Sequence, residues 1–102
     1  MQREQILNVL SRRFALYVLM EVREHPGASK RDVTNREPLF IRTKFERIDD
    51  LVEAGLILEN REPRQHATVK LYLTPEGQEI ADCIARIIEC AKGLPDLEEE
   101  NL

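Results

Sequence analysis

Apolar residues recur at helical spacing through residues 40–55, near the middle of the chain. They form one stripe of a 3.6-residue helix, made of Ile41, Phe45, Ile48 and Val52, with Leu51 at its edge. The opposite side is polar and carries Arg42, Thr43, Glu46, Arg47, Asp50 and Glu53, while Lys44 lies on a flank. Gly55 then supplies the left-handed residue that ends many helices. The pattern predicts an amphipathic helix whose apolar stripe faces a core.

An almost wholly apolar stretch, residues 14–20, precedes this helix. Because it is apolar on nearly every face, we expect a helix surrounded by other elements, the central helix of the core. His25, Pro26 and Gly27 end it, since proline removes a backbone donor and glycine permits a turn. Residues 2–10 also have a helical pattern, and either continue into the central helix or form a separate arm.

A short helix is predicted between these two, over about residues 30–35. Ser29 and Asp32 have the spacing of a capping box, in which serine accepts a bond from the amide three residues on and the acid reaches back. Residues 36–38 then break the pattern with a proline. Two helices joined by a short turn, the second amphipathic, match the helix-turn-helix plan.

Two segments are good strand candidates, residues 56–59 and residues 69–73. In the second segment, Val69, Leu71 and Leu73 are expected to face inward, and the residues that alternate with them, Lys70 and Tyr72, to face outward. The polar segment between the candidates, residues 60–68, contains a proline and several basic side chains. Together they predict a β-hairpin with a long basic tip.

Thr74 and Pro75 begin the last predicted helix, as a capping residue and a proline at the first helical position. Its wide apolar stripe consists of Ile80, Cys83, Ile84, Ile87, Ile88 and Ala91. The helix is expected to end at Lys92 and Gly93. Residues 94–102 are acidic and predict a solvated, disordered tail.

The two cysteines, Cys83 and Cys90, both lie on this last helix. Two helical turns separate their Cα atoms by roughly 10 Å, which is too far for a disulfide within one helix. We interpret both as buried thiols on the apolar stripe rather than as a redox or metal site.

At 102 residues the chain is long enough for one domain with a modest core. A content of 42% apolar and 33% charged residues is typical of a soluble globular protein, here expected in the cytoplasm. The longest apolar run has seven residues, too short for a membrane span, and the N-terminal MQREQ lacks the pattern of a signal peptide.

The net charge of −4 is unevenly distributed. Residues 1–74 carry 13 basic and 11 acidic side chains, whereas residues 75–102 carry 2 and 8. The acidity of the whole chain is therefore a poor guide to what its first three quarters bind.

The order helix, helix, helix, hairpin, helix resembles the winged-helix DNA-binding domain, in particular small prokaryotic regulators of the MarR, ArsR and PadR kind. The segments HPGASKRDV, KFERIDDLVEAGLI and LYLTPEGQEIA carry the resemblance. It implies an α+β, mostly helical fold with a three-helix core, a two-stranded hairpin wing and a C-terminal dimerisation helix. The expected organisation is an N-terminal arm (1–10), a winged-helix DNA-binding domain (11–74), a dimerisation helix (75–93) and the acidic tail (94–102).

The resemblance also implies that the helix of residues 40–55 enters the major groove of DNA, with residues 60–68 as a wing on phosphate or the minor groove. Side chains near the start of such a helix reach base edges, where arginine bonds guanine and glutamate accepts from cytosine. The expected DNA-binding residues are Lys30, Arg31, Arg42, Thr43, Lys44, Glu46, Arg47, Arg61, Arg64, Gln65 and Lys70. Arg42 and Glu46, four residues apart, equally suit a simple surface ion pair.

We expect a homodimer on a palindromic DNA site, because the last helix carries more apolar surface than a small core needs. The expected interface comprises Ile80, Cys83, Ile84, Ile87, Ile88 and Ala91. The alternative is that these side chains pack within the molecule, against residues 14–20.

Three acids in the second half of the predicted recognition helix, Asp49, Asp50 and Glu53, favour a different function. They suit a winged-helix protein–protein interaction module in a larger complex. An enzyme is not indicated, since the sequence has no glycine-rich phosphate loop, no HExxH and no paired-cysteine metal spacing. We therefore expect no catalytic residue, metal or cofactor, and the expected partners are double-stranded DNA and a second copy of the chain.

Overall fold

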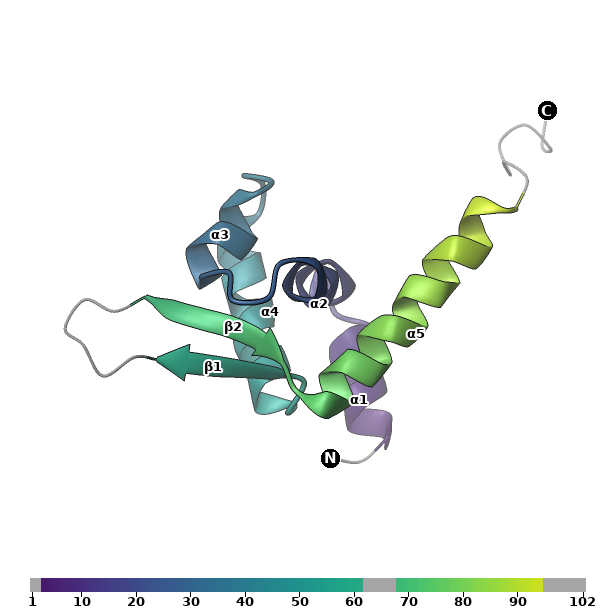
Figure 1. Ribbon diagram of the computed structural model, residues 1–102, viewed down its shortest axis with the longest axis horizontal. Coiled ribbons are helices and arrows are strands. Elements are labelled where there is room, and N and C mark those ends of the chain that lie inside the picture. The colour runs from purple at the N-terminus through teal and green to yellow at the C-terminus, as the bar shows by residue number, and fades with distance from the viewer. Residues whose placement is uncertain (1–2, 62–67, 95–102) are drawn as a thin grey trace.

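The computed structural model describes residues 3–61 and 68–94 (Figure 1). Within these residues the elements follow in the order α1 (Arg3–Leu10), α2 (Ala15–Glu24), α3 (Lys30–Asn35), α4 (Ile41–Glu53), β1 (Ile57–Arg61), β2 (Val69–Leu73) and α5 (Pro75–Lys92). This order of helices and hairpin confirms the predicted α+β winged-helix fold. The predicted wing residues Arg64 and Gln65, and the predicted tail from residue 95 onward, lie outside the described residues.

Side-chain caps place the starts of α3 and α5 where the sequence predicts them. Ser29 Oγ accepts a hydrogen bond of 3.0 Å from the amide of Asp32, whose carboxylate accepts one from the Ser29 amide. Thr74 Oγ1 accepts a bond from the amide of Gly77 and donates one of 2.6 Å to the carbonyl of Gly55. Gly55 has a φ of 80°, as expected of a left-handed helix end. The bond from Thr74 therefore ties the end of α4 to the start of α5.

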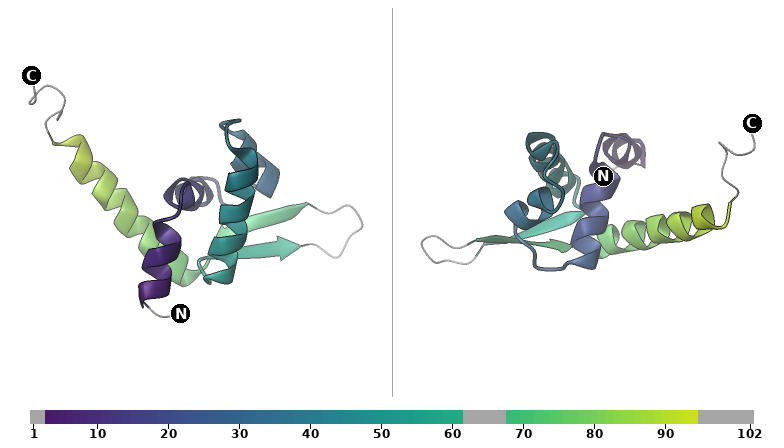
Figure 2. Two further views of the ribbon diagram at one scale, coloured as in Figure 1. Left: turned by 180° about the vertical axis from the view of Figure 1, so that it is seen from behind. Right: turned by 90° about the horizontal axis from the view of Figure 1, so that it is seen from above.

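The wing is an antiparallel pair, β1 against β2, with Ile57 opposite Leu73. The chain just before α3 runs beside β2, because the amide of Gly27 donates to the carbonyl of Leu71 at 2.8 Å. The amide of Leu71 in turn donates to the carbonyl of Ala28 at 2.9 Å. These bonds hold the hairpin against the helices, and the hairpin and α5 extend in opposite directions from the molecule (Figures 1 and 2).

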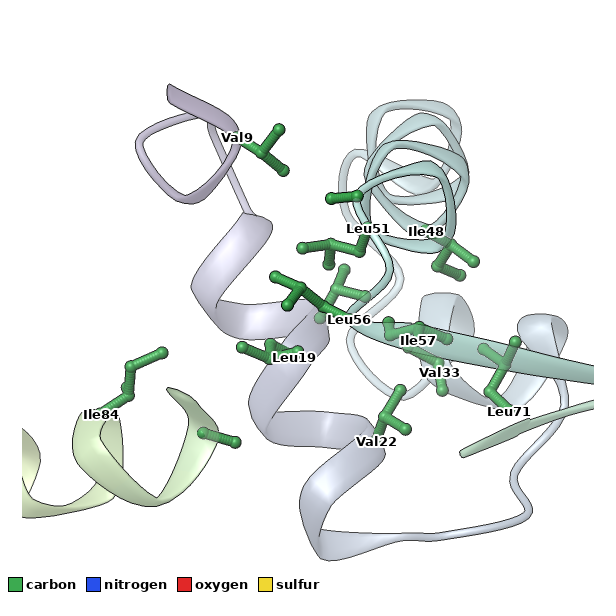
Figure 3. Close-up of a cluster of buried hydrophobic side chains, with 13 residues drawn as sticks. Val9, Leu19, Val22, Val33, Ile48, Leu51, Leu56, Ile57, Leu71 and Ile84 are labelled. Atoms are coloured by element: carbon green, nitrogen blue, oxygen red, sulfur yellow. The ribbon is translucent and has the colours of Figure 1, made fainter. Parts of the chain in front are cut away.

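The central helix of the core is α2, as predicted, and it contacts α1, α3, α4, α5 and β2. Val18, Leu19 and Val22 of α2 are fully buried, and Figure 3 shows Leu19 and Val22 among side chains from the neighbouring elements. The expectation that α2 is covered on nearly every face is wrong for Leu16, which is 45% exposed. The reason is a hollow between α2 and α5, which Leu16 helps to line.

The core-facing stripe of α4 differs from the predicted one. The buried residues of α4 are Lys44, Ile48 and Leu51, whereas Ile41 and Phe45 are 36% and 37% exposed. A search for apolar residues does not find a buried lysine, because lysine counts as charged. Its alkyl stem can nevertheless cover apolar surface while its ammonium forms bonds elsewhere. Ile41 and Phe45 therefore lie at the edge of the buried stripe.

The second half of α5 extends away from the core (Figure 1). Ala81 and Ile84 are buried, and after Ile84 the described residues of α5 are half-buried or exposed. Cys83 and Cys90 are exposed free thiols, so the prediction of buried cysteines is wrong. At about 100° per residue they lie on the side of α5 opposite Ala81 and Ile84.

The helices of residues 3–61 and 68–94 are all too short or too polar to cross a membrane.

Candidate nucleic-acid interface

The outer face of α4 carries the side chains that a groove-binding helix would present. Arg42 is 95% exposed in the first turn, and Glu46 and Asp49 follow on the same face at 56% and 71%. Arg42 Nε lies 3.8 Å from a carboxylate oxygen of Glu46, so this exposed pair is loose and is worth only a few tenths of a kcal/mol. Thr43 is half-buried on a flank. Arg42 is therefore free to turn toward a ligand.

Lys44 does not belong to this face, and the prediction that Lys44 contacts DNA is wrong. Its side chain is fully buried, and its Nζ donates a hydrogen bond of 2.6 Å to the main-chain carbonyl of Glu37. The ammonium also lies 4.7 Å from the centroid of the Tyr17 ring and 5.4 Å from that of Phe14. Lys44 thus fastens the turn before α4 to α2 and has no exposed surface to offer DNA.

Arg47 is also held inside the molecule. Its guanidinium donates to the carbonyl of Arg13 at 2.9 Å and to the carboxylate of Asp50, and its side chain is 17% exposed. The bond to Arg13 joins α4 to the chain just before α2, whereas Asp50 lies on α4 itself. The role of Arg47 in this arrangement is to position α4, with little of its surface directed at solvent.

Lys30, at the start of α3, bridges two other elements. Its Nζ lies 2.8 Å from a carboxylate oxygen of Glu59 on β1 and 3.5 Å from one of Asp49 on α4. The hydrogen bond to Glu59 raises the pKa of Lys30, although partial burial opposes the shift. Lys30 therefore holds the wing and α4 together as a charged group.

The acids of α4 are partly neutralised by neighbouring cations. Asp49 lies near Lys30, and Asp50 lies 3.1 Å from a guanidinium nitrogen of Arg12 as well as beside Arg47. Glu53 is exposed and has no ion-pair partner among the described residues. Two of the three acids predicted for the second half of α4 are therefore paired, although Asp49 remains 71% exposed.

Other cations near the wing and α3 are exposed. Arg31, Arg61 and Lys70 have no carboxylate partner in residues 3–61 and 68–94. Arg61 is the last residue of β1, and Lys70, on β2, lies opposite Asn60 of β1. Two cations of the wing therefore have no carboxylate partner within the described part of the chain.

Arg13 is a further exposed cation that sequence reasoning missed. Its guanidinium carbon lies 4.1 Å from the centroid of the Phe40 ring and 5.0 Å from that of Phe14. The two rings lie 5.3 Å apart, so Phe40 and Phe14 pack together beneath the cation. Sequence spacing gives no signal for this group, because 26 positions separate the two phenylalanines along the chain.

The predicted dimer residues fall into two groups. Ile84 is 8% exposed and joins the core, and Ile80 packs partly against it, so the intramolecular alternative holds for these two. Cys83, Ile87, Ile88 and Ala91 are exposed, with Ile87 at 65% and Ile88 at 40%. A mainly apolar hollow of about 350 Å³ lies between α2 and α5. Its apolar lining consists of Leu16, Tyr17, Met20, Ile84, Ile87 and Ile88.

No protein-family model matches the sequence, and no curated protein matches it. Solved structures do match. The transcriptional regulator SlyA has a TM-score of 0.73 at 23% identity, over 97% of this chain and 72% of that one. The reduced form of the regulator YodB from B. subtilis has a TM-score of 0.75 at 16% identity, over 94% and 96% of the two chains.

A third structure was solved with its ligand. FabT from Streptococcus pneumoniae, in complex with DNA, has a TM-score of 0.64 at 18% identity, over 92% of this chain and 73% of that one. At such identities the similarity is one of fold. The chain accordingly has the winged-helix fold of these transcriptional regulators.

Proposed function

We propose that this chain is a sequence-specific DNA-binding transcriptional regulator that acts as a homodimer on a palindromic site. The observation that carries the proposal is the outer face at the start of α4, where Arg42 is 95% exposed. An α-helix fits the major groove, and an arginine in its first turn can bond both acceptors of guanine. That FabT, a protein of the same fold, was solved in complex with DNA supports this reading.

The wing supplies the second contact. Arg61 and Lys70 are exposed cations without a carboxylate partner in the described part of the chain, and neither contributes to the core. Cations in such positions bind backbone phosphates and fix the orientation of the protein without reading sequence. The wing and α4 would then contact one stretch of duplex together.

The dimer is supported by the second half of α5. Ile87 and Ile88 are 65% and 40% exposed, and they border the apolar hollow next to Leu16. An apolar face of this kind on a small protein favours a partner. A second copy placed by a two-fold axis would cover the same face on both chains and would relate the two α4 helices by the symmetry of a palindrome.

The alternative, a protein–protein interaction module, loses part of its support. It was based on an acidic face of three side chains, and two of them, Asp49 and Asp50, lie within ion-pair distance of Lys30 and Arg12. Paired acids offer a basic partner less than free ones do. The DNA-binding function is therefore the better reading of α4.

Selection from a random-sequence duplex pool tests the proposal. The purified full chain is equilibrated with the pool at two salt concentrations, and bound DNA is sequenced after each round. We expect enrichment of a palindromic motif and an affinity that falls as salt rises, because phosphate contacts release counterions. Failure to enrich any motif at either salt concentration would contradict the proposal and favour the interaction module.

A further inference from the structure

The start of α4 presents apolar side chains to solvent, next to Arg42. Leu39, Phe40, Ile41 and Phe45 are 58%, 50%, 36% and 37% exposed. Ile41 and Phe45 are four residues apart, so they lie one turn apart on the same flank of the helix. These four side chains lie within seven consecutive residues. Exposed apolar side chains grouped in this way mark an interaction site, whereas single scattered ones are normal.

The backbone at Phe40 holds this group in place at a cost. Phe40 has a φ of 57°, in the left-handed region, and α4 begins there without a side-chain cap. This conformation is unusual for a bulky residue and is strained. The rings of Phe40 and Phe14, with Arg13 above them, fix the turn that leads into α4. Strain retained in this way is typical of functional sites.

Few polar groups in the first two turns of α4 are available to read bases. Lys44 is buried against Glu37, and Arg47 is engaged by Arg13 and Asp50. The remaining polar residues are Arg42, Thr43 and Glu46. Apolar side chains therefore form one flank of the surface that the start of α4 exposes, beside Arg42.

Base edges in the major groove offer one prominent apolar group, the 5-methyl of thymine. The charge around the apolar residues suits a nucleic acid, because Arg42 and Arg13 are exposed beside them and phosphates line both sides of the groove. Glu46 lies 3.8 Å from nitrogens of both Arg42 and Arg47, which moderates its repulsion of phosphate. An apolar centre with cations at its rim is complementary to a thymine-containing groove.

We propose that the start of α4 reads thymine methyl groups, with Ile41 and Phe45 as the contacting side chains. This inference rests on the proposed function and adds to it the chemical class of base that the start of α4 contacts.

Replacement of thymine by deoxyuridine removes the methyl group and leaves the base-pairing hydrogen bonds unchanged. Each thymine of the selected site is replaced in turn, and affinities are measured for the wild type, Phe45→Ala, Ile41→Ala and Arg42→Ala. We expect the affinity to fall about fourfold for each contacted methyl group that is removed, from the transfer free energy of one buried methyl. This loss should disappear in Phe45→Ala or Ile41→Ala. It should persist in Arg42→Ala, whose affinity falls for both DNAs.

Several outcomes would overturn the inference. A specific site that is insensitive to deoxyuridine at every position, or one without thymine, would refute methyl reading while the proposed function stands. A deoxyuridine effect that persists in both apolar variants would assign the methyl contact to other residues. If no site is selected at all, both proposals fail together. Circular dichroism checks that each variant folds. The comparison of thymine-containing with deoxyuridine-containing DNA, made with the wild-type protein, does not depend on any variant.

Discussion

The ammonium of Lys44 lies 2.6 Å from the main-chain carbonyl oxygen of Glu37, inside the molecule. This single bond closes the turn between α3 and α4 from within, and the rings of Tyr17 and Phe14 lie beside the charge. Because α4 begins immediately after this turn, the bond sets where Arg42 and the exposed apolar residues stand. A buried cation at this point is therefore part of how the fold positions the exposed start of α4.

Replacing Lys44 with methionine keeps an unbranched stem of similar length and removes the charge. We expect the free energy of unfolding to fall by about 1.5–3 kcal/mol, the usual worth of a hydrogen bond to a charged group. Urea denaturation measures the change. The control is Arg42→Met, at an exposed position on the same helix, with an expected change within about 0.5 kcal/mol. Equal stabilities of the two variants would show that the ammonium contributes nothing to the fold.

Gly77 lies where α5 crosses the start of the wing. A Cβ added there would lie 2.0 Å from the carbonyl oxygen of Leu56, so the helix or β1 would have to move. We expect Gly77→Ala to destabilise the protein by about 1–3 kcal/mol, as overpacking does. At Gly93 the nearest such atom is 3.6 Å away, and Gly93→Ala should leave stability unchanged or raise it by about 0.4–1 kcal/mol. Thermal unfolding that ranks the two variants in the opposite order would refute this packing.

The proposed dimer is best tested at Ile87 rather than at Ile84. Ile84 is 8% exposed and belongs to the core, so a charge there would compromise folding itself. Ile87→Glu, at a side chain 65% exposed, should convert the dimer to a monomer in sedimentation equilibrium while the helical signal remains. Leu58→Glu, at 56% exposure on β1, is the matched control and should remain dimeric. A dimer that survives Ile87→Glu would place the interface elsewhere.

Lys30 gives the protein a pH-dependent contribution to stability. Its pKa is raised above the ordinary 10.5 by the hydrogen bond to Glu59, with a smaller contribution from Asp49. A raised folded-state pKa means that this stabilisation is complete below about pH 10.5 and is lost as pH rises through the folded value.

NMR titration of the Lys30 side chain measures this shift directly. Glu59→Gln should lower the pKa of Lys30 more than Asp49→Asn does, since Glu59 is the nearer partner, at 2.8 Å against 3.5 Å. An unchanged pKa in Glu59→Gln would show that the bridge between α3 and the wing does not persist in solution.

Local chemistry made most of the fold predictable. The capping box at Ser29, the cap at Thr74 and the left-handed Gly55 each depend on a few neighbouring residues, and each holds in the structure. The strand β2 was predicted at its observed bounds because its alternation is local too. Such features need no knowledge of distant contacts.

The candidate site was less predictable, because its organisation depends on contacts between distant segments. Nothing in the spacing of α4 indicates that Lys44 turns inward, since the carbonyl that receives it belongs to the preceding turn. Cys83 is exposed because the core covers the opposite side of α5, where Ala81 and Ile84 are buried, and a helical stripe alone does not specify which side is covered. Charges assigned from pattern to the DNA face, such as Lys30 and Arg47, are likewise engaged by partners that only the fold brings near.

In the proposed function the start of α4 reads DNA through Arg42, which is 95% exposed. Arg42→Ala should weaken binding to the selected site by about 1–3 kcal/mol and relax the preference at one base position in each half-site. Arg47→Ala is the comparison, because Arg13 and Asp50 hold that guanidinium. Its loss should change the affinity by the same factor whichever base position is substituted.

The most direct measurement is therefore a complete set of single-base substitutions of the selected site, with affinities determined for the wild type and Arg42→Ala. We expect one symmetric pair of guanine positions at which the wild type discriminates and Arg42→Ala does not, with other positions unchanged. An Arg42→Ala profile that parallels the wild type at every position would contradict this expectation.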